Sequence, residues 1–298
     1  MLISYIRCFF VLFFILNSTL IFSQNCNNLS VSAGSDTSIC LGDSIELGGS
    51  PTASWNSLNP NPNVTYTYLW SANVVNGSIP NPTNSPSIPT TYSVVVIADP
   101  GFPNGLTCTD TAFITVTVLQ LPTLSLSQFA EACENDSPFI LSGGSPTTGD
   151  YSGNGVIGGT SFNPSLANIG TNTITYSYTD NNLCSNTITE PLVVNPLPSV
   201  SFSNSNLDII CIDEGIVTLS GGLPSSGTYS GTGVNNNTFD PSIANIGSHT
   251  IWYTYTDPNN GCSDSASHTV TVTALPIVSF LITNPTQVCS NENPFQLS

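Results

Sequence analysis

Polar and hydrophobic residues alternate along several short stretches of the chain. A period of two is typical of a β-strand that packs one face on a core. The alternation predicts strands at 66–70, 92–97 and 113–118. In the clearest stretch, 251–256, one face carries Ile251, Tyr253 and Tyr255 and the other carries Trp252, Thr254 and Thr256. No stretch has the period of a long amphipathic helix, so we expect an all-β protein.

The alternating segments belong to a repeat that recurs along the chain. Cys133, Cys211 and Cys289 are 78 residues apart, as are Cys184 and Cys262. Leu-Ser-Gly-Gly at 141–144 recurs at 219–222, and Tyr-Ser-Gly at 151–153 recurs at 229–231. Recurrence of whole motifs at a fixed spacing indicates tandem copies of one structural unit.

Leu-Pro pairs separate these copies at 121–122, 197–198 and 275–276. Proline disrupts a central strand but is common in linkers between domains. The pairs predict a divergent domain at 25–120 and two related domains at 121–197 and 198–275. Residues 276–298 align with 198–220, so we expect them to be the truncated start of a further repeat.

Each full repeat holds roughly seven short strands separated by turns, which is typical of an immunoglobulin-like β-sandwich. The predicted fold class is therefore all-β, with tandem immunoglobulin-like β-sandwich domains in series and the last repeat incomplete.

Charge narrows the possible partners. Arg7 is the only Lys or Arg in the chain, whereas 18 residues are Asp or Glu. A chain without other basic side chains cannot neutralise phosphates, which excludes nucleic acid as a natural partner. The same argument excludes an anionic membrane surface.

The first 24 residues have the pattern of a signal peptide. Arg7 precedes the apolar run 8–22, which ends at Ser23 and Gln24. A membrane anchor is the competing interpretation, but the run is short and no basic residues follow it. We expect the mature chain to be extracellular or on the outer cell surface.

Two segments carry a resemblance to a known family: GTNTITYSYTDNNLCS at 170–185 and GSHTIWYTYTDPNNGCSDSASHTVTV at 247–272. They resemble the C-terminal half of polycystic-kidney-disease (PKD)-like repeats, in which a glycine turn leads to an alternating strand, a turn and a final Val-Thr-Val strand. The Trp-Asp-Phe-Gly-Asp-Gly stretch of typical PKD domains is absent, and Leu-Trp-Ser at 69–71 is its nearest counterpart.

The paired cysteines and the Tyr-Ser-Gly-x-Gly-Val strand are similar to tandem repeats of large secreted surface proteins of gliding bacteria. Those adhesin-like proteins are exported by a type IX secretion route. The resemblance implies adhesion, surface display or spacing of other modules, and it does not imply catalysis.

Cysteines provide the strongest candidate sites. Eight of the nine cysteines remain after loss of Cys8, and an exported chain meets an oxidising compartment. Three cysteines open the predicted domains and three close them, which predicts the disulfides Cys40–Cys108, Cys133–Cys184 and Cys211–Cys262. Cys26 and Cys289 are left over. Zinc is the competing interpretation, but no Cys-x-x-Cys or His-rich spacing supports it.

Calcium is the one candidate cofactor. If the predicted disulfides form, carboxylates gather beside the closing cysteines, and a hard cation bound by oxygen ligands could share them. The candidate ligands are Glu134, Asp136 and Asp180 in one repeat and Asp213, Glu214, Asp257 and Asp264 in the next. The alternative is that these carboxylates stay solvated in turns.

Three Asp-Ser/Thr-x triplets resemble the O-glycosylation pattern of the same bacterial group, and their acceptors are Ser44, Thr111 and Ser265. The alternative is that the triplets are strand starts after a turn.

No catalytic residue is predicted. His249 and His268 have Asn172 and Glu190 as counterparts in the sister repeat, and no nucleophile motif accompanies them. We interpret both histidines as strand surface residues, and Trp70 as a core residue.

The sequence therefore predicts a non-catalytic exported protein with an adhesion or spacer role towards an extracellular glycan or protein. The alternative is a carbohydrate-binding accessory region of a secreted hydrolase, for which the exposed candidate is Trp252.

Overall fold

A computed structural model describes residues 26–56, 63–71, 73–101, 107–204 and 207–279. The predicted signal peptide 1–24 lies outside the described residues, as does Cys289. Contacts group the chain into two compact units. Of the described residues, the first unit comprises those up to 125 together with 177–187, and the second comprises 126–176 and those from 188 onward.

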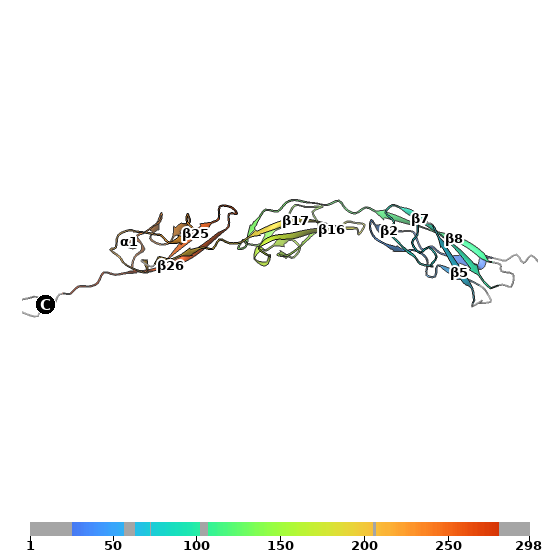
Figure 1. The fold of residues 1–298 in the computed structure, drawn as a ribbon, viewed down its shortest axis with the longest axis horizontal. Coiled ribbons are helices and arrows are strands. Elements are labelled where there is room, and N and C mark those ends of the chain that lie inside the picture. The colour runs from blue at the N-terminus through green and yellow to red at the C-terminus, as the bar shows by residue number, and fades with distance from the viewer. Residues whose placement is uncertain (1–25, 57–62, 72, 102–106, 205–206, 280–298) are drawn as a thin grey trace, which may run out of the picture. The chain divides into compact units, whose positions relative to one another are not determined.

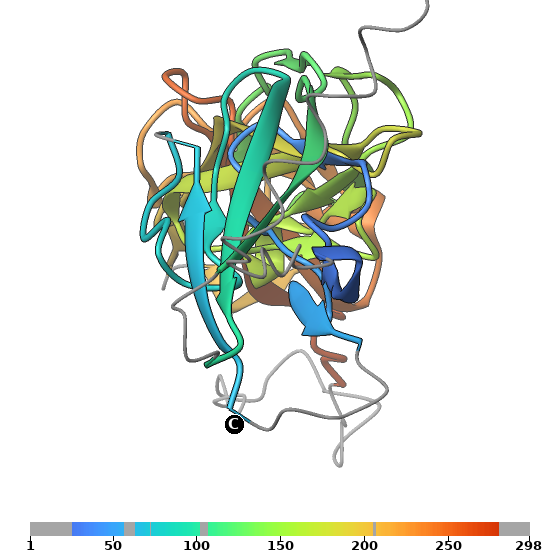
Figure 2. The same ribbon diagram turned by 90° about the vertical axis from the view of Figure 1, so that its right-hand side faces the viewer.

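The first unit contains one four-stranded sheet and two two-stranded sheets. Figure 1 labels the strands of the larger sheet, and Figure 2 shows the same ribbon turned by 90°. The large sheet has the order β2-β8-β7-β5, and its strands are β2 (Thr37–Cys40), β8 (Cys108–Leu119), β7 (Thr90–Asp99) and β5 (Thr65–Trp70). The small sheets pair β1 (Leu29–Val31) with β4 (Ala53–Trp55) and β3 (Ile45–Glu46) with β6 (Thr83–Asn84). A 3-10 turn, η1 (Cys26–Asn28), precedes them.

The next set of sheets repeats this plan. Its four-stranded sheet has the order β10-β17-β16-β13, from β10 (Ala132–Cys133), β17 (Ser185–Asn195), β16 (Gly170–Thr179) and β13 (Asp150–Ser152). A three-stranded sheet has the order β11-β15-β14, from β11 (Phe139–Ile140), β15 (Ser161–Phe162) and β14 (Val156–Ile157). A two-stranded sheet pairs β12 (Gly144–Ser145) with β9 (Ser125–Leu126). The 3-10 turn η2 (Pro164–Leu166) leads into β16.

The third set lies in the second unit and has the same order. Its four-stranded sheet is β19-β26-β25-β22, from β19 (Ile209–Cys211), β26 (Ser263–Thr273), β25 (Gly247–Thr256) and β22 (Thr228–Ser230). A three-stranded sheet has the order β20-β24-β23, from β20 (Val217–Thr218), β24 (Thr238–Phe239) and β23 (Val234–Asn235). A two-stranded sheet pairs β18 (Ser201–Phe202) with β21 (Gly222–Leu223). The single α-helical turn among the described residues, α1 (Pro241–Ala244), precedes β25.

In each four-stranded sheet, the first strand along the chain pairs in parallel with the last strand along the chain, which is its neighbour in the sheet. Cys40 at the end of β2 is level with Leu119 at the end of β8. Cys133 is level with Asn195, and Cys211 is level with Thr273. The three strand-end cysteines therefore occupy one equivalent position, beside the C-terminal end of a long strand.

The recurring glycine and tyrosine motifs build the core of the second and third sets. Tyr229 and Tyr253 pack with ring centroids 4.7 Å apart, and Gly222 donates its backbone N–H to the Tyr229 hydroxyl at 3.0 Å. A Cβ atom at Gly222 would lie 2.5 Å from the Tyr253 ring, so only glycine fits there. The sister repeat has the same arrangement, in which Gly144, Tyr151 and Tyr176 take the places of Gly222, Tyr229 and Tyr253.

This architecture confirms the predicted fold class of tandem β-sandwich domains. The strands predicted at 66–70, 92–97 and 113–118 lie within β5, β7 and β8. On β25, Ile251 and Tyr253 are buried and Trp252 is 46% exposed, as the alternation predicts. The domain boundaries at the Leu-Pro pairs stay a prediction.

Candidate functional site

Disulfides join the strand-end cysteines to hairpin cysteines far along the chain. Cys40 is bonded to Cys184 and Cys133 to Cys262, with Cα atoms 5.5 Å apart in both pairs. Cys26 is bonded to Cys108. Among the described cysteines, Cys211 is the free one. The predicted pairs Cys40–Cys108, Cys133–Cys184 and Cys211–Cys262 are therefore wrong, although five of the six cysteines named in them are bonded.

The parallel first strand explains why the predicted pairs cannot form. Cys133 is level with Asn195 at the end of β17, whereas Cys184 directly precedes Ser185, where β17 begins. Cys184 and Asn195 are eleven positions apart, which is roughly 36 Å along an extended strand. A disulfide needs Cα atoms within about 7 Å. The same eleven positions separate Cys108 from Leu119 and Cys262 from Thr273.

The bonded turn therefore meets the hairpin of the following repeat. In the first unit, the turn after β2 meets the tip of the hairpin between β16 and β17, which belongs to that unit. Within the turn, the Cys40 N–H donates to Asp43 Oδ2 at 3.3 Å. Within the hairpin tip, Asp180 Oδ1 accepts from the N–H groups of Asn182 and Cys184, both at 2.9 Å. These local bonds hold the backbone of each cysteine within its own turn.

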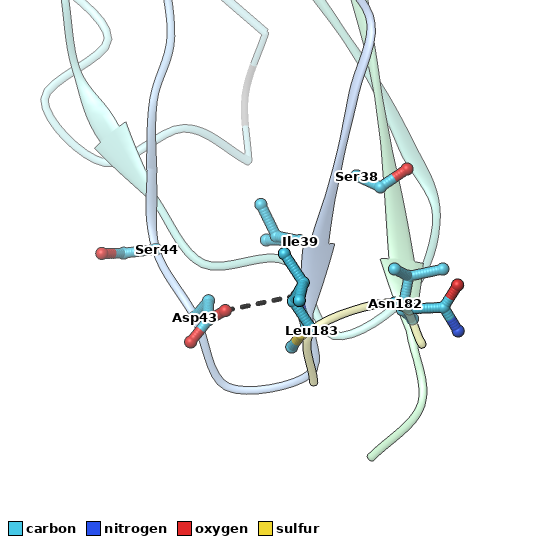
Figure 3. A pocket seen from close by; sticks show the side chains of 8 residues that line it. Ser38, Ile39, Asp43, Ser44, Asn182 and Leu183 are labelled. Atoms are coloured by element: carbon cyan, nitrogen blue, oxygen red, sulfur yellow. Dashed lines mark hydrogen bonds between the residues drawn. The ribbon is translucent and has the colours of Figure 1, made fainter. Parts of the chain in front are cut away.

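An open hollow of about 440 Å³ lies beside this first junction, and Figure 3 shows the side chains around it. Strand β2 contributes Ile39, the turn after it contributes Asp43 and Ser44, and the hairpin tip contributes Asn182 and Leu183. Leu183 is 82% exposed, and its positive φ of 66° is that of a tight turn. The hollow is a crevice of the joint between repeats, and its lining lacks the converging charged groups of a catalytic pocket.

The second junction has the same construction. Asp136 Oδ2 accepts the Cys133 N–H at 2.7 Å, and the Cys262 N–H donates to Asn260 Oδ1 at 2.9 Å. One further bond crosses the joint, because Asn135 Nδ2 donates to the backbone oxygen of Ser263 at 3.4 Å. The sequence carries a signal for these turns in the spacing Cys-x-x-Asp at 40–43 and 133–136, which recurs as Cys-x-x-Glu at 211–214.

The candidate calcium ligands do not gather as predicted. Their assignment assumed bonds from Cys133 to Cys184 and from Cys211 to Cys262, which do not form. Within the described ranges, no three His, Cys, Asp or Glu residues group closely enough to hold a metal ion. Four of the candidates act locally, because they accept backbone N–H groups of nearby residues at 2.7–2.9 Å: Asp136, Asp180 and Asp257 in turns, and Asp264 at the start of β26. Glu134, Asp213 and Glu214 lie in the turns that follow β10 and β19.

The candidate glycosylation sites are open to solvent. Ser44, Thr111 and Ser265 are exposed. The N–H groups of Thr111 and Ser265 donate to the carboxylate of the preceding aspartate, both at 2.8 Å. This bond uses the backbone N–H of Thr111 or Ser265 and not the hydroxyl group. Glycosylation at these positions stays a prediction.

The two histidines have different surroundings. His249 Nε2 lies 2.8 Å from the backbone oxygen of Asn245. His268 is largely covered, in contrast to the surface position predicted for it, because its ring packs edge-on against Phe202 with centroids 5.6 Å apart. His268 Nε2 lies 3.1 Å from Asp208 Oδ1, at an angle unsuited to a hydrogen bond. Trp70 is buried as predicted.

No protein-family model and no curated protein matches the chain. Solved structures similar to it include a Ca2+-stabilized adhesin that helps an Antarctic bacterium reach out and bind ice, at 14% identity over 83% of this chain and 75% of that one, with a TM-score of 0.36. The PKD domain of human KIAA0319 is 23% identical over 34% of this chain and 88% of that one, with a TM-score of 0.24. The insect immune protein hemolin is 13% identical over 83% of this chain and 76% of that one, with a TM-score of 0.24.

Among the described residues, no helix has the length and apolar character needed to cross a membrane.

Proposed function

We propose that this chain is a non-catalytic extracellular or cell-surface protein whose repeats act as covalently joined spacers and adhesive modules. The observation that carries the proposal is the pair of bonds Cys40–Cys184 and Cys133–Cys262, which span 144 and 129 residues. Each ties the turn of one repeat to the hairpin of the following one. Such a bond bypasses the chain between its two cysteines, so it limits how far the modules separate when that chain unfolds, which suits a spacer.

The disulfides also support an exported location, because they persist in oxidising compartments. The signal-peptide pattern at 1–24 supports the same location. Export by a type IX route, as in the surface proteins of gliding bacteria, is the finer proposal and rests on the sequence resemblance.

The outward strand faces suit weak contacts with an extracellular glycan or protein. Hydroxyl groups pair across neighbouring strands at exposed positions, as in Thr91 with Thr115 at 3.2 Å and Thr256 with Ser263 at 2.7 Å. Such faces are polar but almost uncharged, so each contact is weak. Tandem repeats offset this weakness, because several linked contacts raise the effective concentration of the rest.

One observation favours a second candidate, a carbohydrate-binding accessory region of a secreted hydrolase. Trp252 is 46% exposed on the outer face of β25. Its cross-strand partners are Ser267 on β26 and Ser230 on β22. Both partners are small, so they leave one face of the indole open to stack on a sugar ring.

Two assays on the purified mature chain test these proposals. The first measures turnover of polysaccharide, ester and peptide substrates, and activity that is lost on replacing one carboxylate would overturn the non-catalytic assignment. The second measures glycan and cell binding of the chain and of Trp252→Thr. The sister strand carries Thr175 at this position, so the substitution preserves the fold. Loss of glycan binding in Trp252→Thr would favour the second candidate, and unchanged binding would favour adhesion through other faces.

A further inference from the structure

Cys211 occupies a site that is bonded in both preceding repeats. It ends β19 level with Thr273, as Cys133 ends β10 level with Asn195. The turn that follows is already formed, because the Ile212 N–H donates to the Thr273 oxygen at 3.0 Å and the Glu214 N–H donates to the Cys211 oxygen at 3.1 Å. The Cys133 turn makes the same two bonds at 3.0 Å each, from the N–H groups of Glu134 and Asp136.

The exposed side chains around Cys211 are more apolar than those around Cys133. Ile209, two positions before Cys211, is 71% exposed, and Ile216 in the following turn is 66% exposed. The residues at these positions in the preceding repeat are Glu131 and Pro138. Two branched apolar side chains beside a free thiol mark a surface that gains from being covered.

The described cysteines are of two kinds, hairpin and strand-end, and this division indicates which kind of cysteine Cys211 would bond. Hairpin cysteines directly precede or begin the last long strand of a repeat, and all three of them (Cys108, Cys184 and Cys262) are already bonded and fully buried. Strand-end cysteines bond only to hairpin cysteines of the next repeat. Cys26 takes the place of a strand-end cysteine for Cys108. Only the strand-end kind is left open among the described residues, at Cys211.

This asymmetry argues against a second copy of the chain as the partner. Two identical copies could join Cys211 only to another strand-end cysteine, which neither observed junction does. Cys289 follows Cys211 by 78 residues and so is also of the strand-end kind by sequence.

We infer that the turn after β19 is a docking surface for the β-hairpin of a further repeat of the same kind, and that Cys211 forms a disulfide with its hairpin cysteine. The inference extends the proposed spacer function, on which it rests, by naming the partner of Cys211. In the bonding step, the Cys211 thiol and the hairpin thiol lose two protons and two electrons and form one S–S bond. A disulfide oxidant, such as oxidised glutathione, takes them up and yields two thiols.

The test supplies such a hairpin to the full mature chain. Residues 221–275 are fused after Ser298, so that they follow residues 276–298, which align with 198–220. The appended copy of Cys262 then lies 129 residues after Cys211, the separation observed between Cys133 and Cys262. The chain is refolded with oxidised glutathione, alkylated without denaturant and digested under non-reducing conditions. The mature chain has no Lys or Arg, so a protease that cleaves at aspartate replaces trypsin.

We expect peptide mapping to show Cys211 bonded to the appended copy of Cys262, and alkylation of Cys211 to fall by at least about tenfold. The matched control carries Ser in place of that appended cysteine and should leave Cys211 reactive. In the chain without the extension, Cys211 should be alkylated, whereas Cys40, Cys133 and Cys184 are protected.

A second variant covers the case in which the extension does not fold. It replaces 276–298 by a complete copy of 198–275, the sequence that forms the third set of sheets, and it keeps the 129-residue separation. The inference would be overturned if Cys211 is still alkylated in this variant while peptide mapping finds the Cys133–Cys262 disulfide. A bond from Cys211 to Cys289 or to Cys211 of a second copy would also overturn it. Neither result alters the turnover and binding assays, so the proposed function is judged separately.

Discussion

Cys40 is bonded to Cys184, 144 residues further along the chain, and not to Cys108 of its own sheet. The parallel pairing of β2 with β8 accounts for this choice, because it places Cys40 and Cys108 at opposite ends of β8. A bond within one repeat would need the two ends of a strand to meet. A bond to the next repeat needs only that its hairpin reach the end of β2.

Removal of one junction should destabilise the chain without changing the sandwiches. The double variant Cys133→Ser, Cys262→Ser removes both cysteines of the bond, so neither is left as a new free thiol, and it opens a loop closed by a bond across 129 residues. The chain-entropy model gives about 5 kcal/mol for so long a loop, and measured values are typically about 2–4 kcal/mol. Urea unfolding should therefore show a lower midpoint.

Cys211→Ser is the matched control for that experiment, because it removes a cysteine that is free. It should unfold at the midpoint of the unmodified chain. An unchanged midpoint in the double variant, or free thiols at Cys133 and Cys262 in the native chain, would contradict the observed pairing.

The sequence predicts the strands of this fold better than their connections. The alternation at 251–256 is enough to place Ile251 and Tyr253 in the core, because the side-chain period is a local property of a strand. The pairing of Cys133 depends instead on which end of β17 its strand reaches. That depends on the parallel register of β10, which no local pattern encodes. The Cys-x-x-Asp turns are visible in the sequence, but their partners are not.

The hydroxyl of Tyr253 should contribute to stability through two bonds. It accepts the Gly227 N–H at 2.7 Å and donates to the backbone oxygen of Pro224. Tyr253→Phe keeps the ring packing but leaves both backbone groups without this partner, which costs about 1–3 kcal/mol. Tyr176→Phe in the sister repeat should behave alike, because Tyr176 bonds Gly149 and Pro146 in the same way. Chemical denaturation of each variant measures the loss.

Tyr255→Phe provides the control, because the Tyr255 hydroxyl makes no hydrogen bond to the described residues. Equal stabilities of the Tyr253→Phe and Tyr255→Phe chains would show that the two bonds do not contribute.

Glycosylation should appear on Ser44, Thr111 and Ser265 when the chain is made in its own host. All three are exposed, and the aspartate before each completes the Asp-Ser/Thr-x pattern. Peptide mass mapping should find added hexose mass on these residues, and an Asp110→Ala substitution should abolish it at Thr111 only. Unmodified peptides from all three sites would refute the prediction.

Calcium should leave the chain's melting temperature unchanged. The observed disulfides do not bring together the carboxylates that the predicted calcium sites required. Asp180 and Asp257 already accept backbone N–H groups in their own turns. Calorimetry with millimolar calcium and then with a chelator checks this expectation. A melting temperature that rises with calcium and falls with chelator would revive the calcium hypothesis.

Asp240 should make the stability of the third set depend on acidic pH. Its Oδ1 caps α1 by accepting the Ser242 hydroxyl at 2.6 Å and the Ser242 N–H at 2.9 Å. The bond from the Ser242 side chain is the main cause that lowers the pKa of Asp240 below its ordinary value, and the N–H groups of Ser242 and Ile243 add to it. A carboxylate with a lowered pKa stabilises the fold above its unfolded pKa, and this contribution is lost as pH falls through the folded pKa.

Asp240→Asn isolates this contribution, because Asn163 caps the equivalent turn of the sister repeat through the same kind of bond, to the Ser165 N–H at 3.1 Å. The amide does not titrate. The unmodified chain should melt above the Asp240→Asn variant at neutral pH, and the difference should vanish as the pH is lowered to about 2. Asn163→Asp should introduce a matching acid-sensitive gain in the second set. If the difference between the unmodified chain and Asp240→Asn stays constant across this range, the cap does not depend on the charge of Asp240.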